Sequence, residues 1–178
     1  MPSTYEKQDT IVDVAGTKEA YKPSHPGLFE VFYAEGSFNS QLVASQDFKQ
    51  GQIICKIEGT EPGPKRYSSV QVSKDSHIEL NSDLVFLNHS CDPSVTLDTD
   101  EMKLIAAKDI KKGDALTFFY PSSEWEMDQP FPCWCGSTKC CKSIQGAKFL
   151  STKVIDQYYV ASHIRELLKE RDEAQDSK

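Results

Sequence analysis

The chain contains no apolar run long enough to cross a bilayer, which excludes a membrane-spanning helix. Its first residues, MPSTYEKQDT, do not show the basic-then-apolar order of a secretory signal. We therefore expect an intracellular protein, of the nucleus or the cytoplasm, that makes no membrane contact. Cysteine thiols stay reduced inside cells, so disulfides are not expected either.

Positive charge is also scarce. The chain has 20 Lys and Arg residues against 27 Asp and Glu residues, and its formal net charge is −7. Direct binding to nucleic acid depends on cationic contacts with phosphates, so this balance argues against it. An acidic surface suits a basic peptide partner, although such surfaces are also common on soluble proteins without one.

Internal repeats are absent, which excludes solenoid and propeller folds, and 178 residues fit one domain. From Leu28 onward, short β-branched and aromatic runs alternate with Gly, Pro and Asp, which predicts a mainly β body with Cys55 in its core. Residues 1–26 show no periodicity and predict a poorly ordered arm. After Ser151, apolar residues recur at helical spacing and predict one amphipathic helix over 153–169, followed by a charged tail.

The six cysteines are the strongest chemical signal that is present. Cys133, Cys135 and Cys140 form a C-x-C-x4-C pattern, and three thiolates make an incomplete tetrahedral zinc set. Cys141 or Cys91 can complete it. Cys141 is adjacent to a ligand already in use, whereas Cys91 would arrive from a distant loop. Cysteines that only pack or react remain the alternative to a metal site.

Three motifs occur in order along the chain: FLNHSCDPSV (86–95), KKGDALTFFY (111–120) and FPCWCGSTKCCKSIQG (131–146). Together they resemble the catalytic half and the post-SET segment of the SET-domain lysine methyltransferases. The resemblance spans Leu28 to Gly146 and is strongest after Leu84. It implies a SET domain of small curved sheets with a pseudoknot over 27–126, a post-SET zinc segment over 127–150, and a C-terminal helix and tail over 151–178.

The resemblance also implies a cofactor and a ligand set. Asn88 and His89 would contact S-adenosylmethionine, while Cys91 would join the cysteines of the post-SET segment on zinc. Trp134 would cover the adenine of the cofactor, although an outward packing role is equally open. For His89, a purely structural role is the alternative to cofactor binding.

Methyl transfer to lysine needs a deprotonated amine aligned with the sulfonium methyl group. By resemblance, Tyr120 is the catalytic residue, and Phe118 occupies the position that sets how many methyl groups are added. We expect a dry aromatic channel to lower the amine pKa without a dedicated base. Phe119 should face away from this channel and pack, because side chains alternate along a strand.

The chain departs from the family at the Gly-x-Gly turn that approaches the cofactor, where it has Asn39, Ser40 and Gln41. Asn tolerates left-handed backbone angles and Gln rarely does, so this cofactor-binding loop must differ. Gly36 is an alternative turn. Two functions therefore stay open: a methyltransferase acting on lysine in a protein such as a histone, and a SET-like peptide-binding or scaffold module. Methylation of a small amine is a third.

The insert between Pro62 and Ser76 is short, so narrow peptide selectivity is not expected. Several acidic residues are candidates for a rim that holds a basic substrate, or else are solvated surface: Glu58, Glu61, Glu79, Asp83, Glu124, Glu126 and Asp128.

Overall fold

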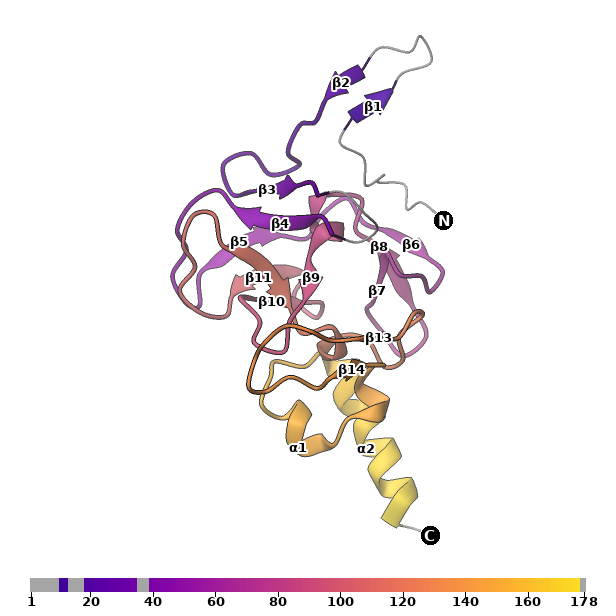
Figure 1. The fold of residues 1–178 in the computed structure, drawn as a ribbon. Helices are drawn as coiled ribbons and strands as arrows, with labels where there is room; N and C mark the ends of the chain where they lie inside the picture. The colour runs from indigo at the N-terminus through magenta and orange to yellow at the C-terminus, as the bar shows by residue number, and fades with distance from the viewer. Residues whose placement is uncertain (1–9, 13–17, 35–38, 177–178) are drawn as a thin grey trace.

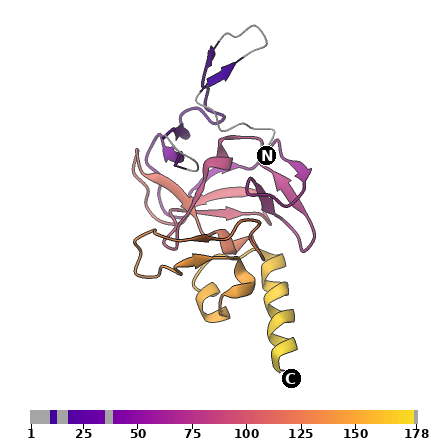
Figure 2. The ribbon, with the colours of Figure 1, turned by 45° about the vertical axis from the view of Figure 1, so that its right-hand side comes forward.

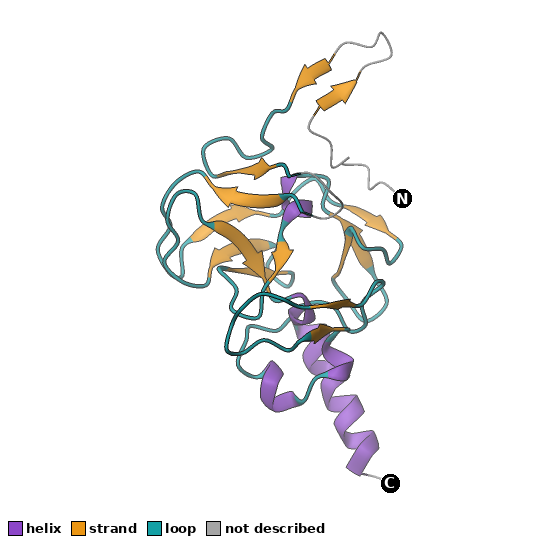
Figure 3. Cartoon of the chain, viewed as in Figure 1, coloured by secondary structure: helices purple, strands orange, loops and turns teal. Residues whose placement is uncertain are grey.

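The computed structural model describes residues 10–12, 18–34 and 39–176 of the chain. Short strands form small sheets, and the α-helices gather at the end of the molecule opposite the N-terminal hairpin (Figures 1 and 3). This architecture confirms the predicted class, mainly β with a helical C-terminus.

Three small sheets build the body. The first has the order β3-β4-β12-β9, with bounds Phe29–Phe32, Gln41–Ala44, Ala115–Phe118 and Asn88–His89. The second has the order β10-β11-β5, with bounds Val95–Asp98, Lys103–Ala106 and Ile53–Lys56. The third has the order β6-β8-β7, with bounds Glu61–Gly63, His77–Glu79 and Ser69–Gln71.

Two hairpins lie outside these sheets. One pairs β1 (Thr10–Val12) with β2 (Lys18–Ala20). The other pairs β13 (Phe131–Pro132) with β14 (Ser143–Ile144). The 3-10 helices are η1, η2 and η3, over Asp83–Phe86, Tyr120–Ser122 and Ala147–Phe149. The α-helices are α1 and α2, over Thr152–Ile155 and Ser162–Asp176. None of the helices in the described ranges is both long and apolar enough to span a membrane.

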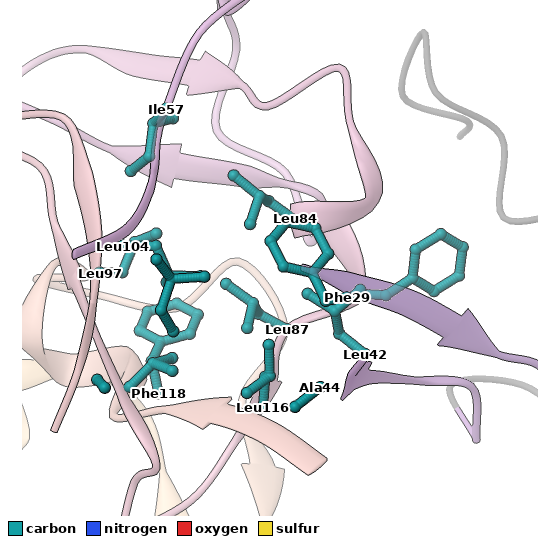
Figure 4. Packing of buried hydrophobic residues seen from close by; sticks show 14 of the residues in the cluster. Phe29, Leu42, Ala44, Ile57, Leu84, Leu87, Leu97, Leu104, Leu116 and Phe118 are labelled. Atoms are coloured by element: carbon teal, nitrogen blue, oxygen red, sulfur yellow. The ribbon is translucent and has the colours of Figure 1, made fainter. Parts of the chain in front are cut away.

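The core follows from the alternation of side chains along the strands. In β3, β4 and β12 every second residue is buried, because successive side chains of a strand point to opposite faces. Figure 4 shows Phe29, Leu42 and Leu116 from these strands packing beside Leu84 and Leu87. Cys55 packs against the edge of this cluster, and burial raises its pKa to about 11, in keeping with its predicted structural role.

The parallel pairing of β9 with β12 positions the site. Asn88 lies opposite Thr117 and His89 opposite Phe118, although about thirty residues separate the two strands in sequence. The Ser90 amide extends this contact by donating to the Phe118 carbonyl at 3.0 Å. The first two motifs thus lie side by side. The predicted pseudoknot would bring these same two segments together.

The prediction of one helix over 153–169 is wrong, since residues 156–161 separate α1 from α2. Tertiary contacts explain the break. The Tyr158 hydroxyl donates to the Cys91 carbonyl at 2.8 Å, and its ring stacks on Phe119 at 3.8 Å. The amide and hydroxyl of Ser162 donate to the Asp100 carboxylate, which caps the start of α2. Figure 2 shows the long yellow α2 apart from the short orange α1.

The N-terminal arm is described in part. Residues 1–9 and 13–17, on which most of the predicted disorder falls, lie outside the described residues, as does Gly36. Tyr21 and Ser24 belong to the ordered body, because the Tyr21 hydroxyl and the Ser24 amide donate to the buried Asp83 carboxylate at 2.6 and 2.8 Å. Residues 21 and 24 of the predicted arm therefore contact the body of the domain.

Candidate active site and metal centre

Tyr120 follows the end of β12 after one intervening residue and opens η2. Its hydroxyl donates to the Leu87 carbonyl at 2.8 Å, and its amide donates to Nδ1 of His89 at 3.2 Å. Because Nδ1 accepts a hydrogen bond, neutral His89 carries its proton on Nε2, which lies 3.3 Å from Sγ of Cys91. Burial lowers the pKa of His89 to about 4, so the ring is neutral near pH 7.

Aromatic rings surround the Tyr120 side chain. The ring centroid of Phe118 lies 4.7 Å away, that of His89 5.3 Å and that of Phe131 5.9 Å. Burial, and secondarily the charge of Glu124, raise the pKa of Tyr120 well above its ordinary value. The hydroxyl therefore stays protonated and acts as a donor to Leu87.

Two cavities meet at Tyr120. The larger, of about 510 Å³, is lined by Asn88, His89, Tyr120, Phe131 and Trp134 among others. The smaller, of about 40 Å³, is lined by residues that include Phe118, Tyr120 and Glu124. Tyr67, Val85, Tyr120 and Met127 line both. Tyr120 thus stands at the boundary between a roomy compartment and a narrow one.

The residues predicted to bind the cofactor are only partly brought together. Asn88, His89 and Trp134 line the larger cavity, and Trp134 is 86 % exposed at its edge. Asn39, Ser40 and Gln41 are not among its lining residues. Ser40 is nevertheless connected to the site, because the Asn88 side-chain amide donates to its carbonyl at 2.9 Å.

Four thiols converge beside the larger cavity. The Sγ atoms of Cys91, Cys133, Cys135 and Cys140 all lie within 4.8 Å of one another. A tetrahedral zinc ion with Zn–S bonds of about 2.3 Å places its sulfur ligands about 3.8 Å apart, so the set fits zinc. Cys141 is not part of this cluster: its amide donates to Cys91 Sγ at 3.3 Å. The geometry therefore favours Cys91 over Cys141 as the fourth ligand.

Sequence reasoning missed a polar group behind the smaller cavity. Oε1 of Glu124 accepts the Gln71 amide at 2.8 Å, and Oε2 lies 3.6 Å from Nε2 of His77. Sequence reasoning had named Glu124 only as a candidate for an acidic rim, and not as a buried group in contact with Gln71 and His77.

The acidic rim proposed from sequence is corrected for three members. Glu79, Asp83 and Glu124 are buried, with 6 %, 0 % and 8 % of their surface exposed. Glu58, Glu61, Glu126 and Asp128 are exposed as expected. Of the seven rim candidates, only these four can contribute a solvated acidic surface.

Comparisons with known proteins agree with the motifs. The SET domain family model matches residues 40–121. The methyltransferase flvH of Aspergillus flavus is 39% identical over 150 residues, which cover 83% of this chain and 84% of that protein. The H3 lysine-36 specific histone-lysine N-methyltransferase of Candida albicans is 29% identical over 129 residues, 59% of this chain but 15% of that enzyme.

A solved structure shares the fold. The match is to the crystal structure of KRYPTONITE in complex with mCHG DNA and SAH, with a TM-score of 0.50 and 20% identity. It covers 65% of this chain and 28% of the KRYPTONITE chain. Since the relative from Aspergillus flavus is similar along most of both chains, and the family model covers the segment that carries the first two motifs, this chain belongs to the SET-domain family.

Proposed function

We propose that this chain is an S-adenosylmethionine-dependent methyltransferase that acts on the side-chain amine of lysine in a peptide or protein. One observation carries the proposal: Tyr120 stands between a large cavity and a narrow one that also contains Phe118. A methyl transfer needs donor and acceptor to approach each other in line, and two adjoining cavities that share Tyr120 allow them to do so from opposite sides.

The larger cavity is assigned to the cofactor. Its volume of about 510 Å³ lies within the range of about 300–1,000 Å³ that is usual for small-molecule sites. Asn88 and His89 would hold the cofactor through side-chain and backbone groups, and Trp134 would cover its adenine. When bound, S-adenosylmethionine supplies an activated methyl group on its sulfonium sulfur.

The narrow cavity is assigned to the lysine amine. The Tyr120 hydroxyl donates its hydrogen bond to the Leu87 carbonyl, which leaves its lone pairs free to accept a hydrogen bond from the amine. This contact would direct the nitrogen lone pair toward the larger cavity. Phe118 would form the wall against which added methyl groups must fit.

The zinc would act structurally. Cys91 belongs to the segment of Asn88 and His89, while Cys133 directly follows β13, whose residues line the larger cavity. A zinc ion on Cys91, Cys133, Cys135 and Cys140 would therefore fix the wall of the cofactor site onto the catalytic sheet.

The acceptor is proposed to be a basic peptide, with a histone tail as the first candidate. The net charge of −7 favours a cationic partner and disfavours direct nucleic-acid binding. The Candida albicans relative is named for a histone lysine. A histone substrate would place this protein in the nucleus.

A peptide-binding module without normal cofactor binding is the second candidate, because Asn39 and Gln41 replace the glycines of the family's cofactor turn. Calorimetric titration with S-adenosylmethionine separates the two. The enzyme should bind it, and intact-mass spectrometry of histone-tail peptides should then show steps of one methyl group. Peptide binding without either result would favour the module.

A further inference from the structure

A second groove, which takes no part in the proposed reaction, lies beside the post-SET segment. Two adjoining cavities of about 310 and 410 Å³ form it, and both are lined by Lys139, Gln157 and Tyr158. We call it the outer groove. Neither of its cavities shares a lining residue with the larger cavity or the narrow cavity of the candidate active site. A ligand of the outer groove is therefore neither the cofactor nor the substrate amine.

The four-thiol cluster separates the outer groove from the cofactor cavity. Cys91 and Cys140 line the groove, whereas Cys133 and Cys135 line the larger cavity. The opposite wall of the groove comes from α1 and from the helix break at 156–161. Figure 1 shows α1 beside the orange loops that carry the thiols. The break that the sequence did not predict thus forms one wall of this groove.

Part of the wall is apolar. Leu150 and Val154 line the second cavity together with Tyr158. The Tyr158 hydroxyl already donates to the Cys91 carbonyl, so the ring is the part of this residue that a ligand can contact. Protein interfaces combine an apolar centre with a polar rim, and the centre of this groove has the first of these features.

The rim of the groove is basic. Residues 129–155 contain four lysines and no Asp or Glu, although the whole chain has a formal net charge of −7. Lys139 lines both cavities, and Lys142 and Lys153 are each next in sequence to a lining residue. All three are exposed, and within the described ranges none of their ammonium groups forms an ion pair. Their charges are available to a ligand.

Two acidic residues lie at or near the groove. Asp92 lines the first cavity, but its carboxylate pairs with Lys108 at 2.9 Å. Asp156 is exposed and lines neither cavity. The thiolates of a zinc site also carry negative charge, yet they belong to buried or half-buried cysteines, whereas the lysines reach solvent. The excess of exposed positive charge favours a ligand that is negatively charged and has an apolar group.

We propose that the outer groove docks an extended acidic peptide of a partner protein. Its carboxylates pair with the three exposed lysines, and an apolar side chain contacts Leu150 and Val154. Nucleic acid is disfavoured as the occupant, because phosphate contacts make no use of an apolar wall and the net charge of −7 repels a long polyanion. The proposal goes beyond the proposed function, whose acceptor is basic, and does not depend on methyl transfer.

The test uses a fluorescent synthetic peptide of alternating Glu and Leu residues. A peptide of alternating Gln and Leu is its neutral counterpart, and single-stranded DNA is the second polyanion. Each is titrated with the full chain and followed by fluorescence anisotropy. The acidic peptide should bind at least about tenfold more tightly than the neutral one, the scale of three exposed ion pairs together. It should also bind more tightly than the DNA, and its preference should shrink as salt screens the charges.

Two variants and a matched control assign the effect to the groove. A chain with Lys139→Gln, Lys142→Gln and Lys153→Gln combined should lose the preference for the acidic peptide. The control removes the same charge from three other exposed lysines, which line neither cavity: Lys22, Lys56 and Lys112. It should keep the preference. Val154→Asp leaves the lysines in place but adds a carboxylate to the apolar wall, so it should weaken the acidic peptide at least about tenfold.

Zinc content and thermal unfolding verify that each variant is folded. The proposal is overturned if the acidic peptide binds no more tightly than the neutral one, or if the control loses the preference equally. Unchanged binding in folded Val154→Asp would place the peptide elsewhere on the chain. DNA that binds more tightly than the peptide, and is lost with the three groove lysines, would make nucleic acid the occupant instead. None of these measurements uses methyl transfer, so failure here leaves the proposed function untouched.

Discussion

The Tyr120 hydroxyl donates a hydrogen bond to the carbonyl oxygen of Leu87 at 2.8 Å. Leu87 directly precedes Asn88, the first residue of β9, so this bond joins the proposed catalytic tyrosine to the segment proposed to contact the cofactor. With the bond from the Tyr120 amide to His89, it holds the aromatic ring between the two cavities from both ends.

Tyr120→Phe should lower kcat on a histone-tail peptide by at least about 100-fold, the effect of removing one positioned polar group at a reacting centre. The ring and its packing against Phe118 remain, so calorimetry should show nearly unchanged cofactor affinity. Loss of one buried hydrogen bond should lower the free energy of unfolding by about 1 kcal/mol.

Tyr158→Phe is the control for this change. It also removes a tyrosine hydroxyl that donates to a backbone carbonyl, that of Cys91 at 2.8 Å, but Tyr158 lines neither the larger nor the narrow cavity. It should lose similar stability and keep its turnover within a few-fold. Full activity of Tyr120→Phe on a verified substrate would remove Tyr120 from the mechanism.

Phe118→Tyr should shift the products toward fewer methyl groups per lysine. Phe118 lines a cavity of only about 40 Å³, so an added hydroxyl there takes space that a methylated amine needs and can hold a water in its place. Intact-mass spectra over time would measure the ratio of mono- to trimethylated peptide, while the rate of the first transfer should change little. An unchanged ratio would show that Phe118 does not limit methylation.

Tyr120 and Phe118 are residues that the sequence motifs alone identify. The β9–β12 pairing that brings Asn88 and His89 beside β12 was predictable only through the resemblance, because contacts between distant segments leave no local signal. The resemblance implied Cys91 as the fourth ligand in place of Cys141, and the distances between the thiols favour the same choice. The helix break at 156–161 was unpredictable because Tyr158 follows helical spacing but is held by Cys91 and Phe119.

The purified protein should contain one zinc per chain by elemental analysis. Cys135→Ser and Cys91→Ser should each remove it, since a tetrahedral structural site needs four ligands, and hydrogen exchange over 131–146 should then speed up. Cys141→Ser should leave the zinc content unchanged, because Cys141 contacts the cluster through its backbone amide. If Cys141→Ser loses the metal and Cys91→Ser keeps it, the ligand assignment is wrong.

Gly146 joins the post-SET segment to the body through a close backbone contact. Its φ is +114°, and a Cβ there would overlap the Trp125 carbonyl. Gly146→Ala should therefore cost more than the about 1–3 kcal/mol of an unfavourable backbone angle alone. Gly113→Ala isolates that angle term, because Gly113 has φ +92° with nothing within 4 Å of a built Cβ. Equal losses in urea unfolding would refute the clash.

The last prediction concerns the altered cofactor turn. Neither Asn39 nor Gln41 has a positive φ in the structure, so the hypothesis places the cost in the cofactor-bound turn. If that turn needs glycine-like backbone angles, Asn39→Gly together with Gln41→Gly should tighten S-adenosylmethionine by about 5- to 150-fold, which corresponds to about 1–3 kcal/mol. Stability should move the other way, because Gln41 begins β4 opposite Phe32 and glycine in a strand costs about 0.5–1 kcal/mol. The hydrogen bond from the Asn88 side chain is accepted by the backbone carbonyl of Ser40, so it can persist in the variant.

Calorimetric titration of the wild type, both single variants and the double variant would measure this effect, with thermal unfolding followed in parallel. Tighter binding with lower stability is the combination expected if only the cofactor-bound turn needs glycine, whereas a general rise in stability would raise both. Unchanged affinity in the double variant would mean that Asn39 and Gln41 do not restrict the cofactor. Absence of measurable binding in every form, with intact folding, would favour the peptide-binding module over the enzyme.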